Sequence, residues 1–177
     1  DKTELLRNTF VREFRAVEGM PQLYSRLATS GVAFHYVSGS PWQLYGPLDA
    51  FLGGAGFPDG TYHLKHFRLK DSSALEMLSS QQKTKLAAIE PLLAAFPERK
   101  FILIGDSGEQ DPEIYGRLAR ERADQIIGIF IHNVTAEESD SERFSKAFQD
   151  VTRDRWTLFE KVSKINAQVV DLARTEH

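Results

Sequence analysis

The chain has 177 residues and a mass of 20.0 kDa, and its hydrophobic (41%) and charged (27%) fractions exclude a disordered or collagen-like protein. The 22 Lys and Arg residues against 25 Asp and Glu give a net charge of -3, so no overall positive field exists to attract nucleic acid, and we expect none as a partner. The absence of Cys excludes disulfides, thiolate metal sites and cysteine nucleophiles.

Nothing in the sequence indicates export or membrane insertion. The longest apolar runs, such as residues 101–104, are far shorter than the roughly 20 residues of a membrane-spanning helix. Residues 1–4 are polar and lack the basic-then-apolar pattern of a secretory signal peptide. We therefore expect a cytoplasmic protein.

Two helices are predicted at the beginning of the chain. Apolar residues recur at helical spacing over residues 5–14 and again from Met20 to Leu27. The second pattern ends at Gly31, a residue that commonly terminates helices.

A short buried strand and a third helix follow. Residues 32–37 are apolar apart from His35, which we interpret as a buried strand residue satisfied by hydrogen bonds. A helix is expected at once, with Ser40 as its N-cap and Pro41 at its first position, ending at the glycines of residues 53–56.

The middle of the chain predicts a bent strand, a loop and a helix. Residues 61–69 begin with strand-like alternation that then shifts phase, which suggests a short strand that bends. Residues 71–82 are polar and indicate a loop. Residues 85–96 carry apolar side chains at helical intervals, and Pro97 ends the pattern.

The clearest parallel-sheet pattern follows. Residues 101–104 and 126–134 are buried strands by their apolar composition, and residues 112–122 between them form a helix. This alternation of strands and helices predicts one α/β domain over residues 1–135.

The pattern changes after residue 135. Residues 136–177 predict an acidic loop and a long C-terminal helix with an apolar stripe. This extension would act as a lid, a packing helix or a partner surface.

Polar residues follow two of the predicted strands. Ser38 comes after the first strand, and Asp106 and Asp111 come after the strand at 101–104. Ligands bind at the carboxyl ends of strands in open parallel sheets. A hydroxyl and two carboxylates there suit an oxyanion such as phosphate together with a hard cation such as Mg²⁺.

Each of these residues also has a structural interpretation. Ser38 could cap the following helix, and Asp111, directly before Pro112, could be an N-cap. Asp106 is harder to explain in this way, because a carboxylate at the end of a buried strand needs a cation or strong donors. Lys83 and Lys85 precede the helix of residues 85–96, where solvated lysines are common.

Three segments carry a family resemblance. They are residues 5–10, residues 34–45 (Phe-His-Tyr-Val-Ser-Gly-Ser-Pro-Trp-Gln-Leu-Tyr) and residues 101–115 (Phe-Ile-Leu-Ile-Gly-Asp-Ser-Gly-Glu-Gln-Asp-Pro-Glu-Ile-Tyr). These segments resemble the catalytic domain of the actin-patch-protein phosphatidate phosphatases, which are haloacid-dehalogenase-like phosphohydrolases related to lipins. The resemblance covers residues 4–135.

The resemblance implies a fold and a chemistry. The fold would be a three-layer Rossmannoid parallel sheet without a large cap domain. The activity would be Mg²⁺-dependent hydrolysis of a phosphomonoester, phosphatidate or a smaller one, through a phospho-aspartate. Ser38 would hold the phosphoryl oxygens, Lys85 (or Lys83) would neutralise the phosphate, and Asp106 and Asp111 would hold the metal.

One element of the family pattern is missing. Members carry an Asp-x-Asp-Asp-Thr motif on a central first strand, which supplies the nucleophile, and this sequence begins after that point. We therefore expect the chain to be part of a longer enzyme and inactive by itself, with a gap in the sheet between the strands ending near Ser38 and Asp106. The short sequence between Ser38 and Lys85 leaves an open site, which would accept a lipid headgroup at a membrane surface.

Two other functions agree with the same residues. The chain could be a non-catalytic module that binds a phosphorylated ligand or a protein. It could also be a flavodoxin-like receiver in which Asp106 accepts the phosphate.

Overall fold

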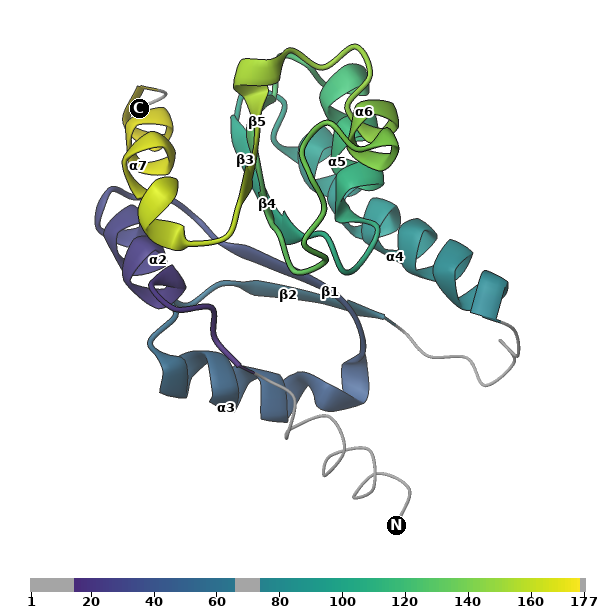
Figure 1. The fold of residues 1–177 in the computed structure, drawn as a ribbon. Coiled ribbons are helices and arrows are strands. Elements are labelled where there is room, and N and C mark those ends of the chain that lie inside the picture. The colour runs from purple at the N-terminus through teal and green to yellow at the C-terminus, as the bar shows by residue number, and fades with distance from the viewer. Residues whose placement is uncertain (1–14, 66–73, 176–177) are drawn as a thin grey trace.

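The computed structural model describes residues 15–65 and 74–175 (Figure 1). The predicted helix over residues 5–14 and the end of the predicted strand at 66–69 lie outside these ranges. In chain order the helices and strands are α2 (Met20–Thr29), β1 (His35–Pro41), α3 (Tyr45–Ala55), β2 (Thr61–Lys65), α4 (Ala74–Ala95), β3 (Phe101–Asp106), α5 (Asp111–Glu121), β4 (Ile126–His132), α6 (Glu142–Ala147), β5 (Trp156–Phe159) and α7 (Asn166–Thr175). Within the described ranges no helix has both the length and the apolar character needed to cross a membrane.

The strands form two parallel sheets, which confirms the predicted α/β class with parallel strands. One sheet pairs β1 with β2, and the other has the order β3-β4-β5. In the second sheet Ile102 lies opposite Gly128, and the register continues to Asp106 opposite His132. Among the described strands no ladder joins β1 to β3. This division lies where the family resemblance predicts a gap.

Helices cover both faces of the β3-β4-β5 sheet, so this part of the molecule has three layers (Figure 1). Side chains alternate along a strand, and β4 shows the consequence. Ile129 and Ile131 pack with α4, α5 and α6 in one apolar cluster, while Phe130 packs with α2 and α7 in the other. The fully buried partners of these strand residues are Leu93, Ile114, Leu118 and Phe144 on the first face and Leu23, Ile165 and Val169 on the second.

The strand β1 begins and ends later than predicted, at His35 and Pro41 instead of residues 32 and 37, and the predicted helix start at Ser40 is wrong. Ser40 and Pro41 are the last residues of β1, and Pro41 lies opposite Lys65 of β2. A 3-10 turn (Trp42–Leu44) then separates β1 from α3. Pairing with a distant strand keeps the backbone extended here, and local capping preferences do not contain that contact.

The predicted loop at 71–82 is also wrong over the residues that the structure describes. Helix α4 begins at Ala74 and continues through Pro91 to Ala95. Residues 74–82 contain helix-forming Leu, Met, Glu and Gln and no Gly or Pro, so a polar composition here is typical of a surface helix as well as of a loop. The helix ends before Pro97, as predicted.

The predicted long C-terminal helix is wrong. Residues 142–175 form α6, the strand β5, two 3-10 turns (Arg153–Arg155 and Val162–Lys164) and α7. Strand β5 pairs in parallel with β4, with Ile129 opposite Trp156, so the sheet crosses the predicted boundary at residue 135. The apolar stripe predicts one helix because its spacing contains no long-range information. The division into a domain over residues 1–135 and an extension over residues 136–177 stays a prediction.

Candidate functional site

A buried ion cluster lies at the carboxyl end of β3. Lys85 of α4 is 5% exposed and Asp111, the first residue of α5, is 4% exposed. The Lys85 ammonium donates to Oδ1 of Asp111 and to Oε2 of Glu109, the latter at 2.5 Å. Oδ2 of Asp111 accepts the backbone N–H of Asp106 at 3.1 Å. The structure therefore brings together three of the predicted site residues, Lys85, Asp106 and Asp111.

The structure also separates Lys85 from the alternative, Lys83. Lys83 is exposed, whereas Lys85 points into the protein. Residues two apart on a helix do not face the same side. Both lysines stand just before the apolar residues that begin at Leu86, so the sequence pattern does not separate them. Only the orientation of α4 distinguishes them.

Asp111 is not the N-cap that the sequence suggested. The N-cap of α5 is Gln110, and Asp111 lies in the first helical turn. Its carboxylate reaches back to the end of β3, where Gly105 leaves room for it. A methyl carbon added to Gly105 would lie 2.8 Å from Cβ of Asp111, so a side chain at this position would displace the carboxylate.

The two members of the pair influence each other's protonation. Burial by itself would lower the pKa of Lys85, but the carboxylates of Asp111 and Glu109 outweigh this effect and hold the pKa above its ordinary value. Burial raises the pKa of Asp111, and the Lys85 ammonium and the Asp106 N–H oppose that rise. Lys85 is therefore a fixed positive charge at the end of the sheet.

Ser38 is the remaining predicted site residue. It is half-buried on β1, and its hydroxyl accepts the backbone N–H of Ser40 at 3.1 Å. Among the described residues no hydrogen bond joins Ser38 to Lys85, Asp106 or Asp111. Its predicted role in holding phosphate stays a prediction.

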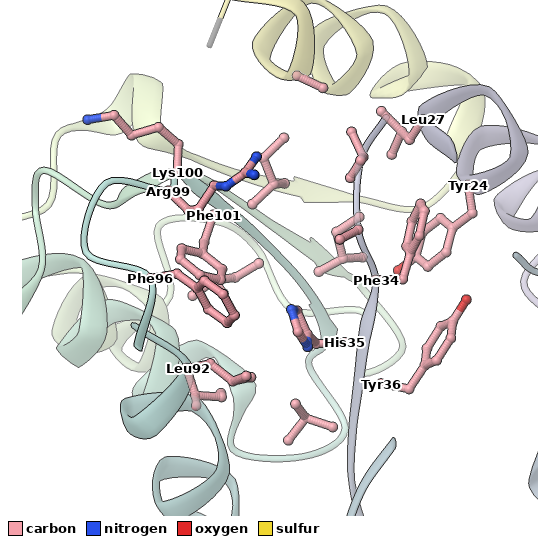
Figure 2. A pocket seen from close by; sticks show the side chains of 18 of the residues that line it. Tyr24, Leu27, Phe34, His35, Tyr36, Leu92, Phe96, Arg99, Lys100 and Phe101 are labelled. Carbon is pink, nitrogen blue, oxygen red and sulfur yellow. The ribbon is translucent and has the colours of Figure 1, made fainter. Parts of the chain in front are cut away.

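An apolar cavity of about 570 Å³ separates the two sheets. Residues of β1 and β3 line it from opposite sides, and Figure 2 shows Phe34 and His35 on one side and Phe96 and Phe101 on the other. None of its lining residues is acidic. Ser38 and Ile104 both line this cavity, so it extends toward the carboxyl ends of the strands.

His35 is half-buried rather than buried, and its ring Nδ1 lies 2.6 Å from Oγ1 of Thr61. Burial and the nearby ring of His63 lower its pKa below the ordinary value of 6.5. The folded state thus binds a proton on His35 less tightly than the unfolded state does. The contribution of neutral His35 to the free energy of unfolding is therefore full above pH 6.5 and falls as the pH drops below that value.

We expect the urea midpoint of unfolding to decline on acidification below pH 6.5, and to decline less steeply in His35→Asn. If the urea midpoint falls equally steeply with pH in the two proteins, the lowered pKa of His35 would be contradicted.

Comparison with known proteins shows which family the chain belongs to. The model of the family described as the catalytic domain of phosphatidate phosphatase APP1 matches residues 1–133. The chain is 34% identical over 143 residues to the phosphatidate phosphatase APP1 of Saccharomyces cerevisiae, with 79% of this chain covered. The chain belongs to the APP1 catalytic-domain family.

A second relative also matches, and both relatives are much longer than the chain. An uncharacterised protein of Schizosaccharomyces pombe is 30% identical over 124 residues, or 70% of this chain. The chain spans 24% of the Saccharomyces protein and 20% of the Schizosaccharomyces protein. Among solved structures, none matches this chain significantly.

The carboxylate oxygens of Asp106 and Asp111 in this APP1-family domain are the type of ligand that Mg²⁺ prefers. Mg²⁺ takes oxygen ligands and often needs only one or two protein carboxylates beside water and phosphate. Asp106 accepts one N–H, from Gly108 at 2.7 Å, and lines a second cavity of about 480 Å³ that also contacts His132. Both oxygens of Asp111 already accept hydrogen bonds. Over residues 15–65 and 74–175 no group of three metal-ligating side chains occurs. Asp106 is thus the carboxylate better placed for a direct contact.

Two residues of the site were missed by the sequence analysis. Glu109 binds Lys85, and Arg143 of α6 binds the backbone of the loop between Asp106 and Asp111. Glu109 lies inside the recognised segment 101–115, so the motif itself was a signal. Arg143 lies in the segment after residue 135, and no local pattern connects it with the site.

Proposed function

We propose that this chain forms most of the catalytic domain of a phosphatidate phosphatase-like hydrolase of the haloacid-dehalogenase type, which releases phosphate from a phosphorylated lipid. The observation that carries the proposal is the buried Lys85–Asp111 pair beside Asp106 at the carboxyl end of β3, in a member of the APP1 catalytic-domain family. Lipid substrates would approach an open site from a membrane surface.

Phosphoryl transfer depends mainly on positioning and on neutralising negative charge. Lys85 would offer its ammonium to the phosphate and to an attacking carboxylate, held in place by Asp111 and Glu109. Asp106 would hold Mg²⁺ directly and Asp111 directly or through water, and the ion would supply further charge neutralisation at the phosphoryl oxygens. The Ser38 hydroxyl would donate to a phosphoryl oxygen.

The nucleophile is proposed to come from an additional strand in the cavity between β1 and β3. That cavity has strands along both sides and a mainly apolar lining, which includes Arg99 and Lys100 but no acidic residue. A carboxylate from the added strand would attack phosphorus as the bond to the lipid oxygen breaks and that oxygen takes a proton. Water would then hydrolyse the aspartyl phosphate to free phosphate. By this proposal residues 1–177 alone have no turnover.

The test compares the 177-residue chain with a version extended by the family's Asp-x-Asp-Asp-Thr strand. Phosphate release from phosphatidate in detergent micelles and from p-nitrophenyl phosphate is measured with Mg²⁺ and with a chelator. We expect Mg²⁺-dependent release by the extended protein alone, lost in Asp106→Asn. Turnover of p-nitrophenyl phosphate only would overturn the lipid assignment. No turnover of either ester would favour the non-catalytic phosphate-binding module.

A further inference from the structure

Arg143 uses every N–H of its guanidinium in one network. Nη1 donates to the carbonyl of Ser107 at 2.6 Å and to Oε1 of Glu137 at 3.1 Å. Nη2 donates to the carbonyl of Glu109 at 2.6 Å and to Oε2 of Glu113 at 3.2 Å, and Nε donates to Oε1 of Glu113 at 2.7 Å. Arginine has five N–H groups, so this set is complete.

The backbone that Arg143 holds is the loop that builds the ion cluster. Ser107 directly follows Asp106, and Glu109 lies two residues before Asp111. The main chain of Glu109 is bound by Arg143 while its carboxylate binds Lys85. A continuous series of contacts therefore runs from α6 through the loop to the buried Lys85–Asp111 pair.

The chain after β4 supplies a second attachment for the same loop. Ser107 is 1% exposed, and its hydroxyl oxygen accepts the N–H groups of Val134 and Thr135 at 3.0 and 3.1 Å. Asn133 then fixes Glu137 through two hydrogen bonds, and Glu137 binds Arg143. These partners lie at or beyond the end of the family match at residue 133.

We propose that Arg143 is a positioning residue that sets the geometry of the loop between Asp106 and Asp111, so that the segment after residue 133 completes the site. Its effect on catalysis rests on the proposed function, whereas its effect on the loop does not. Lysine cannot replace it, because one ammonium cannot bind two carbonyls and two carboxylates in the planar arrangement of a guanidinium.

Arg120 offers a matched control. It also joins α5 to the end of α6, since its Nη1 donates to the carbonyls of Ala147 and Gln149 at 2.9 Å. Within the part of the chain that the structure describes, Arg120 makes no hydrogen bond to the loop. A substitution of Arg120 therefore removes a comparable helix contact without touching the site.

The experiment measures amide hydrogen exchange at Ser107 and Gly108 in Arg143→Lys, Arg143→Ala and Arg120→Ala. We expect exchange to be faster by at least about tenfold in both Arg143 variants, since the two hydrogen bonds from the guanidinium to the loop carbonyls are lost, and no change in the Arg120 variant. Thermal denaturation checks that each variant folds. If Arg143→Ala does not fold, the comparison is made with Arg143→Lys. Unchanged exchange in a folded Arg143 variant would overturn the proposal.

The kinetic readout uses the extended protein described above. We expect Arg143→Lys to lower kcat and to raise the Mg²⁺ concentration for half activity, with little change in KM, and Arg120→Ala to change none of these. If the Arg143 variants exchange faster but the unsubstituted extended protein shows no turnover, the role of Arg143 in the loop is supported and the proposed function is refuted. If kcat is equal in Arg143→Lys and in the unsubstituted protein, the claim that Arg143 affects catalysis by positioning the loop would be refuted.

Discussion

Replacing Lys85 with Met is expected to destabilise the protein by about 3–5 kcal/mol, because removing one partner of a buried ion pair leaves the other charge without compensation. Asp111 is 4% exposed and would keep only the backbone N–H of Asp106 as a donor. The free energy of unfolding from urea titration measures the loss. Lys83→Met, at an exposed position of the same helix, should change stability by less than about 0.5 kcal/mol.

The pH dependence of the Lys85→Met variant provides a sharper check. Without the ammonium, burial raises the pKa of Asp111 with less opposition, so the buried carboxylate is protonated more easily in the folded state. A raised folded-state pKa favours folding at low pH and disfavours it as pH rises through that pKa. The destabilisation should therefore shrink on mild acidification. A loss of stability that is equal at acidic and neutral pH would show that Asp111 is not left as an unpaired charge.

Gly105→Ala is the second large effect that we expect. The added methyl carbon would lie 2.8 Å from Cβ of Asp111 and closer still to its carboxylate, which is buried and bound on both oxygens. Asp111 must therefore move, at a cost of about 1–3 kcal/mol for overpacking together with the loss of its contacts to Lys85 and Asp106. Thermal unfolding and the exchange rate of the Asp106 amide measure the two effects.

Gly53→Ala is the matched control for this substitution. Gly53 lies inside α3, and an added methyl would meet nothing within 4 Å. Alanine favours a helix over glycine, so this variant should gain about 0.5–1 kcal/mol. A similar loss of stability in both variants would mean that Gly105 does not act through its contact with Asp111.

The candidate site could be predicted in part because its residues fall in contiguous motifs. Asp106 and Asp111 follow an apolar strand in the segment 101–115, and both lie at the end of β3 as that pattern indicates. Lys85 could be proposed but not separated from Lys83, because the choice depends on which side of α4 faces the sheet. The position of Ser38 relative to the cluster was likewise beyond sequence reasoning, since it depends on how two unpaired sheets face each other.

The C-terminal region shows the opposite case. Packing against the domain is one of three roles that the sequence leaves open for this region, and its apolar spacing predicts one long helix instead of α6, β5 and α7. A four-residue strand such as β5 owes its existence to pairing with β4, and a helix of six residues such as α6 is not stable by itself. Local patterns report propensities, whereas these short elements depend on the neighbours that cover them.

The amino-acid sequence alone was sufficient for the α/β class, the family resemblance and the acidic residues after β3, because each is recorded in neighbouring residues. Three features emerged only in the folded chain: the choice of Lys85, the joining of β5 to the sheet, and the contact of Arg143 with the carbonyls of Ser107 and Glu109. Each is a contact between residues far apart in the sequence. Such contacts form when packing brings distant elements together, and no local pattern encodes them.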